Sequence, residues 1–113
     1  EANELKRRID GGEAVTVVDV RRSDEFTGSL GHIATARNIP VAELDSRLTE
    51  LAGLERIPIV LICRTDKRSA TAARTLRAAG FTQVGVLREG MVQWNKAGLP
   101  VQGRTSETRL EEG

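Results

Sequence analysis

The sequence has few aromatic residues and almost no net charge, and both properties restrict its partners. Phe26, Phe81 and Trp94 are the only aromatic side chains among 113 residues. The 17 Lys and Arg residues nearly balance the 16 Asp and Glu residues, which leaves a formal net charge of +1. Proteins that bind nucleic acids present stacking aromatic side chains or a basic surface. We therefore expect no nucleic-acid partner.

Cysteine and histidine each occur once, as Cys63 and His32. A single cysteine excludes an internal disulfide and a C-x-x-C redox mechanism. One cysteine and one histidine give no recognisable zinc spacing, so we expect no metal. The sequence also lacks the G-x-x-x-x-G-K-[ST] and G-x-G-x-x-G patterns of nucleotide-phosphate loops. We expect no cofactor.

Long apolar runs are also missing, so no segment is predicted to cross a membrane. The first eight residues do not resemble a secretory signal, which makes the cytoplasm the expected location. A content of 39% hydrophobic and 29% charged residues is typical of a folded domain. We expect residues 1–101 to form one domain. Residues 102–113 are polar and are predicted to be a tail or a linker.

The hydrophobic pattern predicts alternating strands and helices. Runs rich in β-branched residues at 15–20, 57–62 and 84–87 predict strands, with a very short strand near residues 38–39. Apolar positions at helical spacing predict the helices, at 3–10, 23–26, 41–51, 69–80 and 91–97. This alternation predicts an α/β fold with three layers, α/β/α, around a mainly parallel sheet of four to five strands.

Cys63 lies where the most apolar strand ends and the turn into a basic helix begins. Ligands of open parallel sheets bind at the carboxyl ends of strands, and a helix that starts there favours an anion. Arg64, Lys67 and Arg68 add positive charge around the thiol. Cys63 is therefore a candidate nucleophile, held as thiolate. The alternative is a small buried hydrophobic residue, which is the usual role of a free cysteine.

Other polar residues suggest supporting roles. Asp19 and Arg21 follow the strand at 15–20 and are expected at the same sheet edge as Cys63. Arg21 and Glu25 are spaced for an ion pair, although a surface contact of little energetic value is an equal alternative. His32 is flanked by glycine and is interpreted as a hydrogen-bonded structural residue rather than a general base.

Two further polar or aromatic side chains have structural interpretations. Ser69 is predicted to cap the basic helix rather than to act as a nucleophile, because no base lies near it in the sequence. Trp94 is interpreted as a core residue on the last predicted helix.

Three segments resemble the rhodanese domain family. Residues 17–40 resemble its amino-terminal signature, and Cys-Arg-Thr-Asp-Lys-Arg-Ser at 63–69 is similar to its active-site loop. Residues 90–100 are similar to its carboxyl-terminal signature. The three motifs occur in the family's order and cover the chain up to about Val101. The resemblance implies a single α/β domain with sulfurtransferase activity.

By this resemblance, Cys63 attacks the outer sulfur of a small anionic donor such as thiosulfate. It then carries that sulfur as a persulfide and passes it to cyanide or to a thiol, including a thiol on a protein. The backbone amides of residues 64–68 would surround the persulfide, and cationic side chains would attract the donor. The implied substrate-binding residues are Arg64, Thr65, Asp66, Lys67, Arg68 and Ser69, and the residues that support the pocket are Asp19 and Arg21.

Asp66 and Glu89 depart from the family pattern, since many members have glycine at both positions. A carboxylate at either place opposes an anionic donor. A weaker activity or a different donor would follow, and a non-enzymatic module that delivers or receives a partner is a second hypothesis. Phosphatase chemistry is a third. Related cysteine phosphatases place an arginine six positions after the cysteine, where this chain has Ser69.

Overall fold

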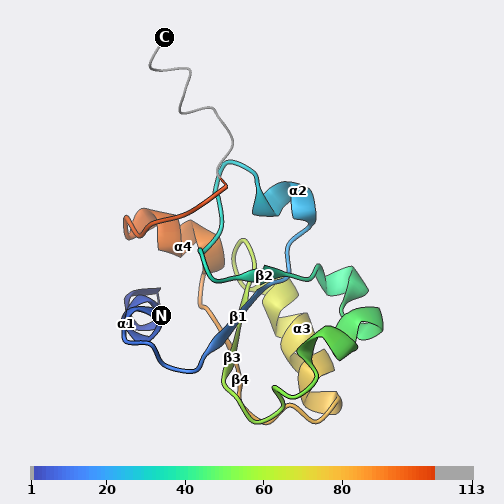
Figure 1. The fold of residues 1–113 in the computed structure, drawn as a ribbon. Coiled ribbons are helices and arrows are strands. Elements are labelled where there is room, and N and C mark those ends of the chain that lie inside the picture. Colours follow the sequence, from blue (N-terminus) through green and yellow to red (C-terminus); the bar gives the residue numbers. More distant parts are fainter. Residues whose placement is uncertain (1, 104–113) are drawn as a thin grey trace.

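The computed structural model describes residues 2–103, which contain one parallel sheet of four strands (Figure 1). The strands are β1 (Thr16–Asp19), β2 (Arg37–Asn38), β3 (Ile59–Ile62) and β4 (Val84–Val86). Their order across the sheet is β2-β1-β3-β4, and every neighbouring pair is parallel. The predicted α/β fold with a mainly parallel sheet is confirmed, with four strands in the described part of the chain.

The two central strands are buried because their side chains are apolar on both faces. Val17 and Val18 of β1 are at most 1% exposed, as are Ile59, Leu61 and Ile62 of β3. Four residue pairs connect the two strands, from Thr16 with Ile59 to Asp19 with Ile62. Burial on both faces is typical of strands inside a parallel sheet. This register brings the ends of β1 and β3, and hence Asp19 and Cys63, to the same edge.

Helices cover both faces of the sheet, as the three-layer prediction requires. In Figure 1, α1 (Ala2–Asp10) and α4 (Gly90–Lys96) lie on one side and α3 (Lys67–Ala78) on the other. One apolar cluster joins α1 and α4 to the sheet through Leu5 and Trp94. A second cluster joins α3 through Leu76. The short helix α2 (Ser23–Phe26) follows β1.

The single helix predicted at 41–51 is wrong, because the segment forms two 3₁₀ helices, η1 (Val41–Glu43) and η2 (Asp45–Leu51). Val41 and Leu44 are three residues apart, and so are Leu48 and Leu51, which suits the three residues per turn of a 3₁₀ helix. The one four-residue step, from Leu44 to Leu48, contains a kink at Arg47.

Gln102 pairs with His32 through two backbone hydrogen bonds, of 2.8 and 2.9 Å. The chain therefore remains attached to the fold at least to this residue. Residues 104–113 of the predicted tail lie outside the described residues, and the boundary at 101/102 stays a prediction. Within 2–103, no helix has the length and apolar character needed to span a bilayer.

Candidate functional site

Cys63 directly follows β3 and is 1% exposed. Its Sγ accepts a hydrogen bond from the backbone N–H of Ser69, at 3.4 Å. Helix α3 begins at Lys67, so Ser69 is its third residue, and the N-cap residue Asp66 makes no capping hydrogen bond with its side chain. The third amide of a helix normally bonds to the side chain of the N-cap residue. Here the cysteine sulfur supplies that acceptor.

The prediction that Ser69 caps α3 is therefore wrong. The helix starts two residues before Ser69, and the Ser69 amide bonds to the sulfur atom of Cys63. Ser69 is fully buried, and its Oγ has no hydrogen-bond partner among residues 2–103.

The loop after Cys63 contains a run of backbone amides without a protein acceptor. The N–H groups of residues 64–68 make no hydrogen bond within the described part of the chain. Consecutive amides of this kind, at the start of a helix, favour an anion. The amide found at the sulfur belongs to Ser69, one residue beyond the predicted set. The predicted contact of the five preceding amides with a persulfide stays a prediction.

Backbone hydrogen bonds from the start of α4 hold the loop after Cys63 in place. The N–H of Met91 donates to the carbonyl of Cys63 at 2.9 Å, and the N–H of Val92 donates to that of Arg64 at 3.1 Å. Gly90 has a φ of +46°. A Cβ there would overlap the Cys63 carbonyl oxygen and would lie 2.7 Å from that of Thr65. Only glycine allows this approach, so Gly90 positions the loop. No pattern around Gly90 in the sequence predicted this role, although Gly90 opens the carboxyl-terminal motif at 90–100.

Asp66 and Glu89, the two departures from the family pattern, are in direct contact. The Oδ1 atom of Asp66 accepts the backbone N–H of Glu89 at 2.7 Å. Glu89 has a φ of +61° and is the only residue other than glycine with a positive φ in the described part of the chain. The Asp66 carboxylate thus fastens the cysteine loop to the loop before α4.

Arg68 forms an ion pair with Glu25 of α2. Its two terminal nitrogens lie 2.5 and 3.0 Å from the two carboxylate oxygens. The hydrogen bond from Arg68 lowers the pKa of Glu25, and partial burial opposes this effect. The pKa of Arg68 is raised mainly by the same hydrogen bond. This pair connects α2 to the first turn of α3.

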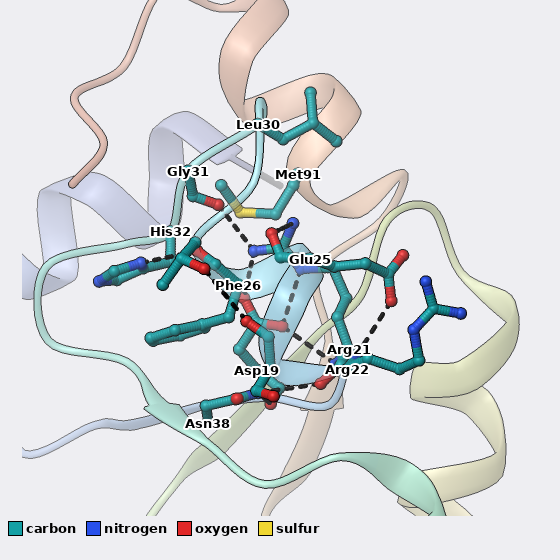
Figure 2. Close-up of polar contacts among 12 residues, drawn as sticks. Asp19, Arg21, Arg22, Glu25, Phe26, Leu30, Gly31, His32, Asn38 and Met91 are labelled. Atoms are coloured by element: carbon teal, nitrogen blue, oxygen red, sulfur yellow. Dashed lines mark hydrogen bonds and ion pairs between the residues drawn. The ribbon is translucent and has the colours of Figure 1, made fainter. Parts of the chain in front are cut away.

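The predicted ion pair between Arg21 and Glu25 is wrong. Arg21 donates to the backbone oxygen of Glu25 at 3.2 Å, and the Glu25 carboxylate binds Arg68 instead. Arg21 is held by Asp19 (Figure 2). Its Nε lies 2.9 Å from Oδ1 of Asp19, and its Nη2 lies 2.7 Å from Oδ2. Its Nη2 also donates to the carbonyl of Gly31 at 2.7 Å. The guanidinium of Arg21 is therefore bound by the buried carboxylate of Asp19 and not by that of Glu25.

The Asp19–Arg21 pair is almost fully buried, with side-chain exposures of 0% and 1%. Arg21 also lines a cavity of about 200 Å³ together with Arg64, the residue after Cys63. Asp19 and Arg21 thus lie at the predicted edge, where they fix the end of β1. Their predicted role in supporting the pocket stays a prediction.

His32 and Trp94 have structural contacts, as predicted. The His32 ring stacks on Phe26 with centroids 3.7 Å apart, and its Nδ1 lies 2.9 Å from the Phe26 carbonyl oxygen (Figure 2). Trp94 is 1% exposed, and its Nε1 donates to the carbonyl of Pro100 at 2.9 Å. Both residues therefore have structural contacts within the fold.

The remaining predicted residues form the outer part of the loop. Arg64, Thr65 and Lys67 are exposed, whereas Asp66 and Arg68 are half-buried. Unpaired amides and exposed cations next to the sulfur can together stabilise a negative charge on it. No cluster of three or more His, Cys, Asp or Glu side chains within residues 2–103 is arranged to hold a metal ion.

Comparisons with known proteins bear on the family and the fold of the chain. The family model described as Rhodanese-like domain matches residues 1–97. The HTH-type transcriptional regulator Rv0324 of Mycobacterium tuberculosis is 48% identical over 87% of this chain, and the match covers 42% of the regulator. The putative sulfur carrier protein YrkF of Bacillus subtilis is 35% identical over 80% of this chain and 46% of its own length. The chain thus spans less than half the length of either relative.

A solved structure with a similar fold is that of a thiosulfate sulfurtransferase from Pseudomonas aeruginosa. Its TM-score is 0.76 at 31% sequence identity, and the match covers 88% of this chain and 19% of that one.

Proposed function

The chain belongs to the rhodanese-like domain family, and on that premise we propose that it is a sulfurtransferase that acts through Cys63. It takes sulfane sulfur from a small anionic donor, of which thiosulfate is the representative. It passes the sulfur to cyanide or to a thiol, which can belong to a protein. The reduced cytoplasm, where such thiols persist, is the proposed location.

The observation that carries this proposal is the environment of the Cys63 sulfur. Sγ accepts the Ser69 amide at 3.4 Å, and the amides of residues 64–68 have no acceptor in the described part of the protein. Donors at these positions favour a thiolate and then a persulfide anion. The thiolate attacks the outer sulfur of thiosulfate, the S–S bond of thiosulfate breaks, and sulfite leaves with the electron pair. A nucleophilic acceptor then removes the outer sulfur and regenerates the thiolate.

The charges and the burial around the loop suit a small anion. Lys67 and Arg64 are exposed beside the cysteine, while Glu25 neutralises Arg68. The Asp66 carboxylate accepts a hydrogen bond from the Glu89 amide. This bond weakens the repulsion between the carboxylate and an anionic donor, but Asp66 keeps its negative charge. Because Cys63 is 1% exposed, a donor with a protruding terminal sulfur reaches it more easily than a bulky one.

The experiment is a steady-state assay of thiocyanate formed from thiosulfate and cyanide. We expect activity in the wild type and none in Cys63→Ser. Lys67→Ala should raise KM for thiosulfate several-fold. Arg74→Ala, which removes an exposed cation further along α3, is the matched control and should leave KM unchanged. Equal activity of wild type and Cys63→Ser would refute the proposal. A wild type without activity towards thiosulfate or any other donor of sulfane sulfur would also refute it.

A second candidate function is a sulfur-responsive regulatory module, and the 48% identity to an HTH-type regulator favours it. In that case residues 1–101 would form the responsive domain and residues 102–113 a linker to a neighbouring domain. Cys63 would become a persulfide, but transfer to an acceptor would be slow. A Cys63→Ala substitution in the full-length protein separates the two candidates. The module would be favoured if Cys63→Ala abolished a regulatory response while the wild type itself showed too little turnover for the substitution to reduce.

A further inference from the structure

The hydroxyl of Ser69 is the one buried side-chain polar atom in the described part of the chain that lacks a hydrogen-bond partner. Ser69 is 0% exposed and lies in the first turn of α3. A buried hydroxyl without a hydrogen-bond partner destabilises a fold, so a functional explanation for it is needed. Alanine would fit at this position, favours a helix more than serine does and carries no unpaired group. The fold alone therefore gives no reason for this hydroxyl.

The same residue is already fixed at the Cys63 sulfur. Its backbone nitrogen lies 3.4 Å from Sγ, and its Oγ is only three covalent bonds from that nitrogen. The hydroxyl therefore belongs to the residue whose amide contacts the reacting atom, and no hydrogen bond joins the two side chains in this structure. A persulfide extends the cysteine by one sulfur atom, which lies about 2.05 Å beyond Sγ. That atom carries the negative charge of the persulfide and accepts hydrogen bonds.

We propose that the Ser69 hydroxyl donates a hydrogen bond to the outer sulfur of the Cys63 persulfide. This inference rests on the proposed function, and it assigns to Ser69 a role in storing the transferred sulfur. In the step concerned, a thiolate and thiosulfate are converted to a persulfide anion and sulfite, so sulfur atoms and charge balance. The hydroxyl has no acceptor before the step and gains a charged one after it. Ser69 thus favours the loaded form of the protein over the unloaded form.

The test is the equilibrium between the two forms. Wild type, Ser69→Ala, Ser69→Thr and the exposed control Ser46→Ala are incubated with mixtures of thiosulfate and sulfite at fixed ratios. Intact mass spectrometry then measures the fraction that carries one extra sulfur. We expect the loading equilibrium constant to fall about tenfold in Ser69→Ala, which corresponds to about 1.4 kcal/mol. Ser46→Ala should match the wild type, and Ser69→Thr, which keeps the hydroxyl, should recover most of the loading.

Thermal unfolding separates this role from a structural one. In the thiol form, Ser69→Ala should be at least as stable as the wild type, because it removes an unpaired buried hydroxyl. Loading with sulfur should raise the melting temperature of the wild type more than that of Ser69→Ala. An unchanged loading equilibrium in Ser69→Ala would overturn the inference, whether or not Ser69→Thr folds. Wild-type protein that takes up no sulfur would instead refute the proposed function, and the two failures are therefore distinguishable.

Discussion

Substituting Gly90 by alanine should weaken both the fold and the site, and a second glycine provides the control. Gly90 has a φ of +46° and Gly98 a φ of +75°, so alanine is strained at both positions. A residue with a Cβ in the left-handed region costs roughly 1–2 kcal/mol. Nothing lies within 4 Å of a Cβ built on Gly98, so Gly98→Ala should cost only this amount.

Gly90→Ala should cost more because its Cβ would meet backbone rather than open space. It would overlap the Cys63 carbonyl oxygen and would lie 2.9 Å from that of Arg64. Relief requires the loop to move away from α4, which breaks the hydrogen bonds from Met91 and Val92. Each such bond contributes about 1 kcal/mol net. With the backbone strain included, we expect a total loss of about 3–4 kcal/mol in the free energy of unfolding.

Urea denaturation of the two variants measures these losses, and the thiosulfate assay measures the effect on the site. Under conditions in which both variants are folded, Gly90→Ala should slow sulfur transfer at least tenfold, while Gly98→Ala should retain most of the wild-type rate. Equal destabilisation by the two substitutions would refute the view that α4 holds the cysteine loop through close backbone contact. Full activity of a folded Gly90→Ala variant would refute the link between this contact and catalysis.

Three further substitutions test separate parts of the site. Asp19→Asn leaves the buried Arg21 guanidinium without its anionic partner, and we expect urea denaturation to show a loss of about 3–5 kcal/mol. The pKa of Glu25 is lowered from its ordinary value of 4.5, so the ion pair with Arg68 stabilises the protein above that pH and is lost on acidification. Glu25→Gln should therefore be less stable than wild type at pH 7, and the difference should shrink below about pH 4.5, as thermal melts across pH will show. Asp66→Asn keeps an oxygen for the Glu89 amide but removes the charge, so KM for thiosulfate should fall several-fold at low salt and less at high salt.

The arrangement of the sheet could be predicted from sequence because it depends on local composition. The β-branched runs that form β1 and β3 are buried on both faces, and their carboxyl ends determine where Asp19 and Cys63 lie. The position of the cysteine between the end of β3 and the start of α3 followed from the same pattern.

The contacts that hold the loop could not be predicted, because they join residues far apart in the chain. Arg68 and Glu25 are 43 positions apart, whereas Arg21 is only four positions from Glu25 and is spaced for an ion pair with it. Only the burial of Asp19 decides which arginine remains for Glu25. The amides of α4 that bind the loop carbonyls are backbone groups, which no side-chain pattern reveals.

The predicted boundaries and type of two helices were wrong because the deciding contacts are not visible in the sequence pattern. Serine before a run of small residues is a normal cap signal, but here a sulfur atom six residues earlier accepts the amide that a cap would bind. The helix therefore starts earlier, and Ser69 becomes a buried residue of its first turn. In the segment 41–51, the spacing of apolar residues fits a 3₁₀ helix as well as an α-helix, so periodicity could not separate them.

A single-turnover measurement of sulfite tests most directly whether Cys63 carries sulfur. Protein is mixed with excess thiosulfate in the absence of any acceptor, and the sulfite released is measured against the amount of protein. We predict about one equivalent of sulfite per chain for the wild type and none for Cys63→Ser, since each thiolate can take only one sulfur. Release of sulfite by Cys63→Ser, or none by a folded wild type with a free thiol, would contradict the account.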